Sequence, residues 1–137
     1  MKTASSAKIL VFNTKGDVLV LYRSETHPWS PHAPDLPGGI VNSHESFEDG
    51  IVRELQEETG LIVDPDKLEK LYEAEALEPH GITMHRVIFG VHLPDIDPDV
   101  VLSWEHEKFE WRKLEDIKDI EASNQKGIDA ILVSRRS

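Results

Sequence analysis

The stretch from Gly39 to Leu61 constrains this chain more than any other part of its sequence. It begins with a glycine, carries Glu45 after five intervening residues, and after seven more reads Arg-Glu-Leu-Gln-Glu-Glu-Thr-Gly-Leu. The Leu-Pro-Gly-Gly segment that leads into it predicts a turn, because glycine tolerates backbone angles that are closed to other residues. The acidic run predicts a helix, and Gly60 predicts its left-handed end. We therefore expect the end of a strand, a glycine turn and an acidic helix.

The expected helix has a capped start and one apolar face. Ser43 or Ser46 can cap its free N–H groups, and the acids near this end suit the positive pole of the helix dipole. At about 100° per residue, its apolar side chains fall in one stripe. The acids are Glu45, Glu48 and Asp49, and the stripe consists of Phe47, Ile51 and Leu55, with Val52 beside it.

Three carboxylates of this helix share one patch. Glu54 and Glu58 lie one turn apart at the edge of the apolar stripe, with Glu57 next to them. Arg53 stands one turn before Glu57, at the spacing of an i,i+4 ion pair. Charge runs on helices are usually solvated surface, but a solvated surface needs no arginine, glycine turn and glycine stop at fixed offsets. Because Mg²⁺ binds a few carboxylates and keeps water and substrate phosphates in its shell, we predict a Mg²⁺ site here, with Mn²⁺ as a substitute.

The same stretch resembles the Nudix box, whose pattern is glycine, five residues, glutamate, seven residues and Arg-Glu-aliphatic-any-Glu-Glu-any-Gly-aliphatic. Every specified position is filled, although Gly50 stands where the family commonly has alanine. The resemblance covers about a sixth of the chain. It implies an α/β fold of the Nudix type, an α/β/α sandwich with a mixed β-sheet. It also implies divalent-metal-dependent hydrolysis of a nucleoside diphosphate linked to another moiety.

The resemblance also implies roles for single residues. Arg53 is expected to orient the glutamates rather than to touch substrate, and Glu45 to brace the loop before the helix. Glu54 is expected to act directly in catalysis. The metal ligands expected from the box are the backbone carbonyl of Gly39 and the carboxylates of Glu54, Glu57 and Glu58.

One further acid is expected outside the box. The segment Glu105–Trp111 alternates polar and aromatic residues, as a half-buried strand does. It resembles the Glu-His-any-any-aromatic-any-Trp segment of the Nudix branch that hydrolyses deoxynucleoside and dihydroneopterin triphosphates. In that branch the glutamate completes the metal shell from a loop, and the matching position is Glu105. Glu107 is the reserve candidate, and a plain acidic loop before a core strand is the alternative.

Arg23 ends an expected strand just before the long loop Ser24–Asp35. It is either a surface charge or a contact to substrate phosphate, which the planar arginine fork suits. Trp29 in this loop is predicted to anchor the loop rather than to stack on a base, because a lone tryptophan is more often packing. Pro34 stands where many Nudix relatives carry a tryptophan near the Leu-Pro-Gly-Gly turn.

The remaining elements follow from apolar runs and from the turn residues between them. The first two strands are separated by the turn Asn13–Asp17, which predicts a hairpin. We expect strands or strand fragments at Ala7–Asn13, Val18–Arg23, Leu61–Val63, Lys67–Leu77 and Thr83–Leu93, a short helical connector at Leu114–Ile120, and a closing helix at Ser123–Val133 capped by Ser123.

Composition narrows the class of protein. A length of 137 residues suits one domain, residues 1–137, with a real core. The net charge of −11 argues against a nucleic-acid polymer as partner, and no apolar run reaches membrane-spanning length. The absence of cysteine excludes disulfides and thiolate chemistry and fits a cytoplasmic protein. Monomer and homodimer both remain open.

We predict hydrolysis of a nucleoside triphosphate, or a related small nucleotide, to a monophosphate and pyrophosphate. Within the enzyme class, the alternatives are nucleoside diphosphate sugars, ADP-ribose, dinucleoside polyphosphates and coenzyme A, although no coenzyme A pattern precedes the box. Outside it, the chain would be a regulatory domain that senses a nucleotide without cleaving it. Such domains typically lose box carboxylates, and here all are present.

Overall fold

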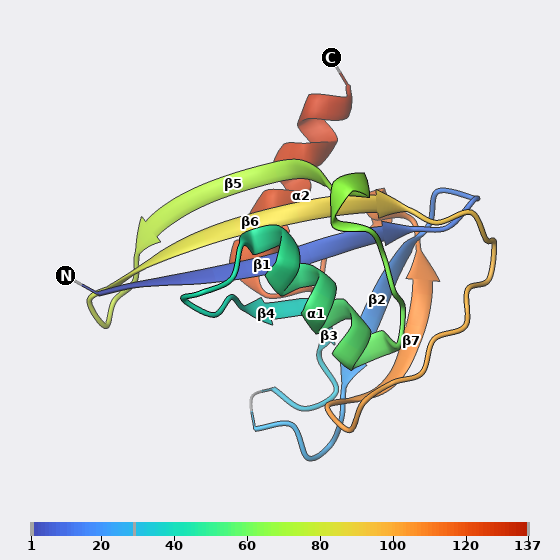
Figure 1. Cartoon of the computed structure of the whole chain (residues 1–137), viewed down its shortest axis with the longest axis horizontal. Helices are drawn as coiled ribbons and strands as arrows, with labels where there is room; N and C mark the ends of the chain where they lie inside the picture. Colours follow the sequence, from blue (N-terminus) through green and yellow to red (C-terminus); the bar gives the residue numbers. More distant parts are fainter. Residues whose placement is uncertain (1, 29, 137) are drawn as a thin grey trace.

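The computed structural model describes residues 2–28 and 30–136. The strands in this part of the chain are β1 (Lys2–Phe12), β2 (Val18–Arg23), β3 (Pro34–Asp35), β4 (Gly38–Ile40), β5 (Glu69–Leu77), β6 (Ile82–His92) and β7 (His106–Arg112) (Figure 1). They form one sheet of order β3-β2-β1-β6-β5, with β4 also paired to β1 and β7 to β2. Strands β1 and β6 run parallel and the other described pairs run antiparallel, so the sheet is mixed.

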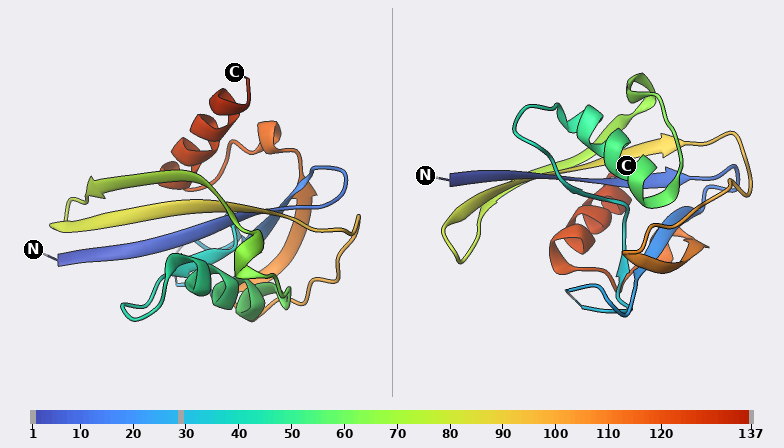
Figure 2. Two further views of the ribbon diagram at one scale, coloured as in Figure 1. Left: turned by 45° about the horizontal axis from the view of Figure 1, so that its top comes forward. Right: turned by 60° about the horizontal axis from the view of Figure 1, so that its bottom comes forward.

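Two helices cover opposite faces of this sheet, as Figure 2 shows. They are α1 (Phe47–Thr59) and α2 (Ala122–Arg135). Alternation along β1 separates the two cores, because successive side chains of a strand point to opposite faces. Ile9 and Val11 pack in the core beneath α1, whereas Leu10 and Phe12 pack in the core beneath α2. The predicted α/β/α sandwich with a mixed sheet is confirmed.

Strands β1 and β2, the two strands of the predicted hairpin, separate directly after the turn that joins them. The turn is present, since the side chain of Asn13 accepts hydrogen bonds from the N–H groups of Lys15 and Asp17 at 3.1 and 3.0 Å. However, β1 and β2 are in register only at Phe12 and Val18. Beyond this point β1 pairs with β6, and β2 turns away to pair with β3 and β7 (Figure 1). As a result, β4 pairs with β1, and β7 pairs with the diverging strand β2.

Several predicted strand boundaries differ from the structure. The first strand begins at Lys2 rather than Ala7, because β6 supplies parallel backbone partners to its polar first half. Leu61–Val63 is not a strand; Val63 packs in the core beneath α1, and the chain then enters the 3₁₀ turn η1 (Pro65–Lys67). The following strand, β5, starts only after this turn.

The closing helix also differs from its prediction. It begins at Ala122 and is capped by Glu121, whose carboxylate accepts a hydrogen bond from the Ser123 N–H at 3.1 Å. The predicted Ser123 cap is therefore wrong, because the preceding glutamate reaches the same free donors. The expected helical connector is reduced to the 3₁₀ turn η2 (Leu114–Asp116).

The loop between β2 and β3 folds back on the end of β2. The Arg23 N–H donates to the carbonyl of Ala33, and the His32 N–H donates to the carbonyl of Arg23, both at 2.9 Å. Trp29, the predicted anchor of this loop, lies outside the described residues. Neither α1 nor α2 has the length and apolar composition needed to cross a membrane.

Candidate active site

Helix α1 is fixed at both ends and along its buried face. Ser46, the second of the two predicted caps, accepts a hydrogen bond from the Asp49 N–H at 3.0 Å. Gly60 ends the helix in the left-handed conformation, with φ 75°. Ile51 and Leu55 are fully buried. These contacts set the rotation of the helix about its axis and therefore the direction of its carboxylates.

The glycine turn lies directly against β1 and α1. Gly38 has a φ of +134°, and a Cβ there would lie 2.1 Å from the Ala7 carbonyl oxygen, so only glycine fits. The Gly38 N–H donates to Glu58 Oε1 at 2.9 Å. A Cβ on Gly39 would lie 3.2 Å from Glu54 Oε1, so this carboxylate rests against the Gly39 backbone. The turn and two helix acids thus form one compact unit.

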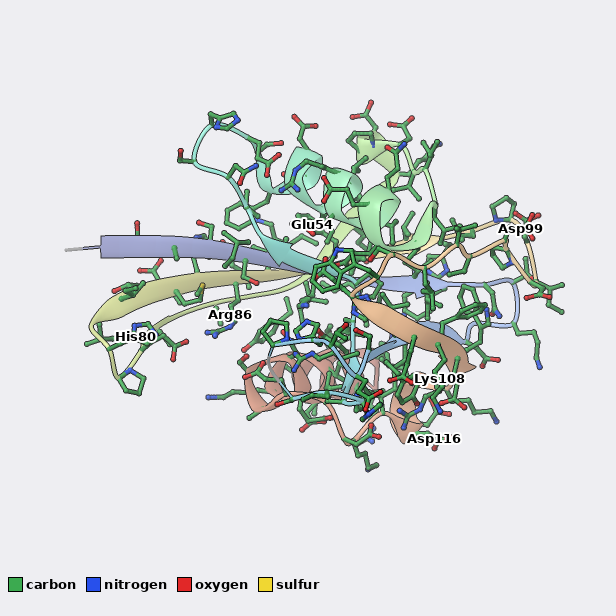
Figure 3. The ribbon with its side chains drawn as sticks, turned by 90° about the horizontal axis from the view of Figure 1, so that it is seen from below. Glu54, His80, Arg86, Asp99, Lys108 and Asp116 are labelled. Carbon is green, nitrogen blue, oxygen red and sulfur yellow. The ribbon has the colours of Figure 1, made fainter. Side chains whose placement is uncertain are left out.

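Glu54 and Glu58, which we call the inner pair, are the acids that face this turn (Figure 3 labels Glu54). Burial raises the pKa of Glu58 to about 8, although the positive charge of Lys8 opposes the shift. Burial also raises the pKa of Glu54, against the opposing charge of Arg53. The charge of Glu105 adds to both shifts. Ionising the inner pair is therefore costly unless a cation is bound.

Glu45 and Glu57, the outer pair, are held by Arg53. The Arg53 guanidinium lies 2.7 Å from Glu45 Oε1 and 3.3 Å from both Glu57 Oε1 and Glu54 Oε1. Glu45 also accepts a hydrogen bond from the Asn42 N–H at 2.9 Å, which ties the loop before α1 to the helix. The Arg53 hydrogen bond lowers the pKa of Glu45 to about 2. The expected i,i+4 pair with Glu57 is present, but the shortest Arg53 contact is to Glu45.

Glu105 lies in a segment whose backbone is hydrogen-bonded both to the residue after β2 and to the end of α1. Its carbonyl accepts a hydrogen bond from the Ser24 N–H at 2.8 Å, just after β2. Two residues earlier, the Ser103 N–H donates to the Glu58 carbonyl at 3.3 Å, near the end of α1. The start of β7 is thus joined to the box helix and to the end of β2, next to the inner pair.

Glu107, the reserve candidate, has a different environment. Its carboxylate lies 2.5 Å from Nδ1 of His32 in the loop after β2, and its side chain is 42% exposed. The charge of Glu105, by contrast, is felt by both members of the inner pair. Of the two predicted acids, Glu105 is the one whose charge raises the pKa of both inner glutamates.

Arg23 lies at a bulge where β2 meets the start of β7, opposite His106. Its guanidinium is 3.2 Å from Asp35 Oδ2, an oxygen that also contacts Lys8 Nζ at 3.3 Å. Despite burial, which alone raises the pKa of Asp35, the charges of Lys8 and Arg23 hold it below its ordinary value. Arg23 is therefore oriented by a buried carboxylate beside the glycine turn.

The donor set is suited to a hard divalent cation. Among the described residues, no three His, Asp or Glu side chains already converge as a formed metal cage. Mg²⁺ does not need such a cage, because it binds through one or two carboxylates and completes its shell with water and phosphate. The inner pair supplies one buried and one half-buried carboxylate, whose ionisation a cation would favour. The residues present therefore fit Mg²⁺ or Mn²⁺.

Two buried polar residues, Asp35 and His106, and the half-buried Lys8 lie beside the site and were not predicted to do so. Lys8 and Asp35 form an ion pair, and burial lowers the pKa of His106 to about 4, which leaves its ring neutral at pH 7. The available signals were weak: a lysine within the apolar run Ala-Lys-Ile-Leu-Val-Phe and an aspartate just before Leu-Pro-Gly-Gly.

The box geometry agrees with the comparison to protein families, in which a model of the NUDIX domain matches residues 2–131. The chain belongs to the Nudix family. A solved Nudix-type structure, the MutT protein of Methanosarcina mazei Go1, is 27% identical, with a TM-score of 0.80 over 99% of this chain and 97% of that one.

Two curated relatives match shorter segments. A "MutT-like protein" of Streptomyces ambofaciens is 34% identical over 64 residues, which are 47% of this chain and 38% of that protein. An "ADP-ribose pyrophosphatase" of Methanocaldococcus jannaschii is 44% identical over 46 residues, which are 34% of this chain and 27% of that protein. Each match thus spans well under half of the curated relative.

Proposed function

We propose that this chain is a divalent-metal-dependent hydrolase that cleaves a phosphoanhydride bond of a nucleoside triphosphate, releasing a monophosphate and pyrophosphate. The observation that carries the proposal is the inner pair, in which Glu58 is buried and Glu54 half-buried against the glycine turn, with the charge of Glu105 acting on both. Like charges withdrawn from water raise the free energy of the folded protein, and a divalent cation held by these carboxylates would offset that cost.

In this proposal Glu54, Glu57, Glu58 and Glu105, with the Gly39 carbonyl, hold Mg²⁺ or Mn²⁺. A cation held there would supply positive charge against the phosphate oxygens and a water molecule of lowered pKa. Phosphoryl transfer otherwise asks the protein mainly to position groups and stabilise charge.

The chain's own residues then have distinct tasks. Arg53 fixes the directions of Glu45, Glu54 and Glu57 through its contacts of 2.7–3.3 Å. The carboxylate of Glu54, whose pKa burial raises, is suited to take a proton from the attacking water. Arg23, held by Asp35, is suited to bind a substrate phosphate.

A second candidate substrate is a nucleoside diphosphate linked to a sugar. It is favoured by the similarity to the relative named "ADP-ribose pyrophosphatase". Dinucleoside polyphosphates offer the same kind of bond to the same carboxylates. A domain that only senses a nucleotide is disfavoured, because every box carboxylate is present and the inner pair lies against the glycine turn.

One assay tests the proposal. The protein is incubated with Mg²⁺ and a panel of nucleoside triphosphates, ADP-ribose, nucleoside diphosphate sugars and dinucleoside polyphosphates, and both products are identified. Release of pyrophosphate from a triphosphate is the expected result, and a Glu54→Gln control must abolish it. Cleavage of ADP-ribose with no cleavage of triphosphates would overturn the substrate class. Binding of nucleotides without turnover of any of them would contradict the proposal that the chain is an enzyme.

A further inference from the structure

Lys8 is a charged residue within the buried part of β1. Its neighbours Ala7, Ile9 and Leu10 are at most 1% exposed, and its own side chain is 14% exposed. An ammonium group withdrawn from water is costly unless its donors are satisfied. A methionine or leucine would fill this place more cheaply, so the contacts of the Lys8 ammonium require an explanation.

The three hydrogen-bond donors of the ammonium are all used. Nζ donates to Asp35 Oδ2 at 3.3 Å, to the Leu36 carbonyl at 3.1 Å and to the Gly38 carbonyl at 3.3 Å. An ammonium has three donors and no acceptor, so no capacity remains. All three acceptors lie in the segment that leads into the box. Lys8 is therefore bonded along the glycine turn rather than to a single partner.

The backbone of Gly38 is consequently hydrogen-bonded to side chains from two elements. Lys8 of β1 binds its carbonyl at 3.3 Å, and Glu58 of α1 accepts from its N–H at 2.9 Å. The next residue, Gly39, carries the backbone against which Glu54 rests. Removing the Lys8 ammonium releases one of these two side-chain restraints, and the turn is then held to β1 by the backbone pairing of β4. We expect the turn to become less well fixed relative to the inner pair.

The same lysine connects the turn to Arg23. Asp35 accepts hydrogen bonds from Lys8 at 3.3 Å and from Arg23 at 3.2 Å, and its other oxygen accepts from the Leu36 N–H at 2.8 Å. Without Lys8, this buried carboxylate keeps one cation instead of two. The contacts of Arg23 are then also expected to loosen.

We propose that Lys8 is a positioning residue of the metal site: it fixes the Gly38–Gly39 turn against Glu58, so that backbone and carboxylate oxygens are held ready for a divalent cation. Its effect on turnover rests on the proposed function, but its effect on metal binding does not. Lys8 touches neither metal nor substrate in this proposal. Its residue type matters because only a group with three donors on one atom joins Asp35, Leu36 and Gly38.

The test compares Lys8→Met with the wild-type protein and with Lys15→Met. Methionine keeps the unbranched stem and removes the donors, and Lys15 is an exposed control, with a side chain 65% exposed. Mn²⁺ binding is measured by electron paramagnetic resonance without nucleotide. We expect about tenfold weaker Mn²⁺ binding in Lys8→Met, and a kcat about 10–100-fold lower with a much smaller change in KM, because residues that orient ligands have effects of this size.

Two further measurements separate positioning from a merely structural role. The unfolding midpoint is recorded for each variant, and all binding is measured well below it. Lys8→Arg keeps the charge, but its planar fork does not reproduce three bonds from one atom, so it should not restore Mn²⁺ affinity. Should Lys8→Met fail to fold, Lys8→Arg decides the matter in the same assay.

Mn²⁺ affinity within twofold of the wild type in a folded Lys8 variant would overturn the inference, whatever its stability. Lys8→Arg with wild-type affinity would also overturn it, because charge alone would then suffice. If the wild-type protein cleaves no nucleotide, the proposed function fails, and the Mn²⁺ measurement still decides the role of Lys8.

Discussion

Two pairs of acids at helix α1 have opposite electrostatic environments: an arginine stabilises the charge of one pair, and burial opposes the charge of the other. The outer pair, Glu45 before the helix and Glu57 on it, contacts Arg53; the nearest contact, to Glu45, is 2.7 Å, and this hydrogen bond lowers the pKa of Glu45 to about 2. The inner pair, Glu54 and Glu58, lies against the glycine turn, and burial raises the pKa of both acids, that of Glu58 to about 8.

This difference suggests different tasks for the two pairs: Glu45 and Arg53 position the site, and the inner pair binds the cation in the proposed function. On the outer side Arg53 contacts both carboxylates, and the side chain of Glu57 is 59% exposed. On the inner side the charges of Arg53 and Lys8 only partly offset the pKa increase that burial causes in Glu54 and Glu58. The negative charge of Glu105 increases both pKa values further. In the proposed function a divalent cation would offset the charge of the inner pair, and Glu57 is the member of the outer pair that would help to hold it.

Removing a charge from the inner pair should have the largest effect. Glu58→Gln keeps the shape and the acceptor for the Gly38 N–H but removes one of the carboxylates that would hold the metal. We expect kcat to fall by about 10³-fold, and Glu54→Gln to behave similarly, because loss of one preorganised charge-stabilising group costs about this much. Steady-state kinetics at saturating Mg²⁺ measure it. Glu48→Gln, an exposed acid of the same helix, is the control, and near-wild-type turnover by Glu58→Gln would remove that residue from catalysis.

The comparison extends to the acid outside the box. Glu105→Gln should lower kcat by about 10²-fold, since Glu105 borders the inner pair. Glu107→Gln is the matched control and should change kcat by less than about threefold, because Glu107 is half exposed and paired with His32. Titrating each variant with Mg²⁺ checks whether the loss at Glu105 includes weaker metal binding. A crippled Glu107→Gln beside a normal Glu105→Gln would reverse the assignment.

Arg53→Ala disturbs the outer side while leaving every carboxylate in place. Glu45, Glu54 and Glu57 lose a common restraint, so we expect kcat to fall about 10–100-fold with a modest change in Mg²⁺ affinity. Isothermal titration with Mn²⁺ and steady-state kinetics separate the two effects. Arg136→Ala, which removes an arginine beyond α2, should resemble the wild type. Complete loss of metal binding in Arg53→Ala would contradict the role of Arg53 as a residue that only orients the proposed ligands.

The smallest effect concerns stability without metal. The pKa of Glu58 is raised from 4.5 to about 8 in the folded protein, so its contribution is favourable below pH 4.5 and is lost as the pH rises towards 8. In EDTA, the unfolding midpoint of the wild type should therefore fall over this window by a few degrees more than that of Glu58→Gln. Glu48→Gln should follow the wild type, and excess Mg²⁺ should reduce the difference. Parallel curves for wild type and Glu58→Gln would mean that Glu58 ionises freely.

Local patterns predicted the box helix well. Ser46 and Gly60 delimit it, and Ile51 and Leu55 form its buried stripe, as their spacing indicates. Capping and helical periodicity depend on residues a few positions apart, so a single sequence contains the information. The predicted ion pair at Arg53 and Glu57 has the same origin.

Contacts between distant segments were predicted poorly. The first half of β1 reads as polar, and only pairing with β6 makes it a strand. Lys8 and Asp35 are 27 positions apart, and their pairing beneath the glycine turn follows from the way β1 packs against β4.

The sequence by itself determined the family, the acidic helix with its glycine turn, and the type of metal that its oxygen donors suit. Only the tertiary structure decided which acids are withdrawn from water, which acid outside the box acts on their pKa, and which lysine bonds to the glycine turn. The physical reason is that residue type and spacing determine local backbone geometry and donor chemistry. Desolvation and charge coupling instead depend on packing between segments such as α1, β1 and the start of β7, which no local pattern records.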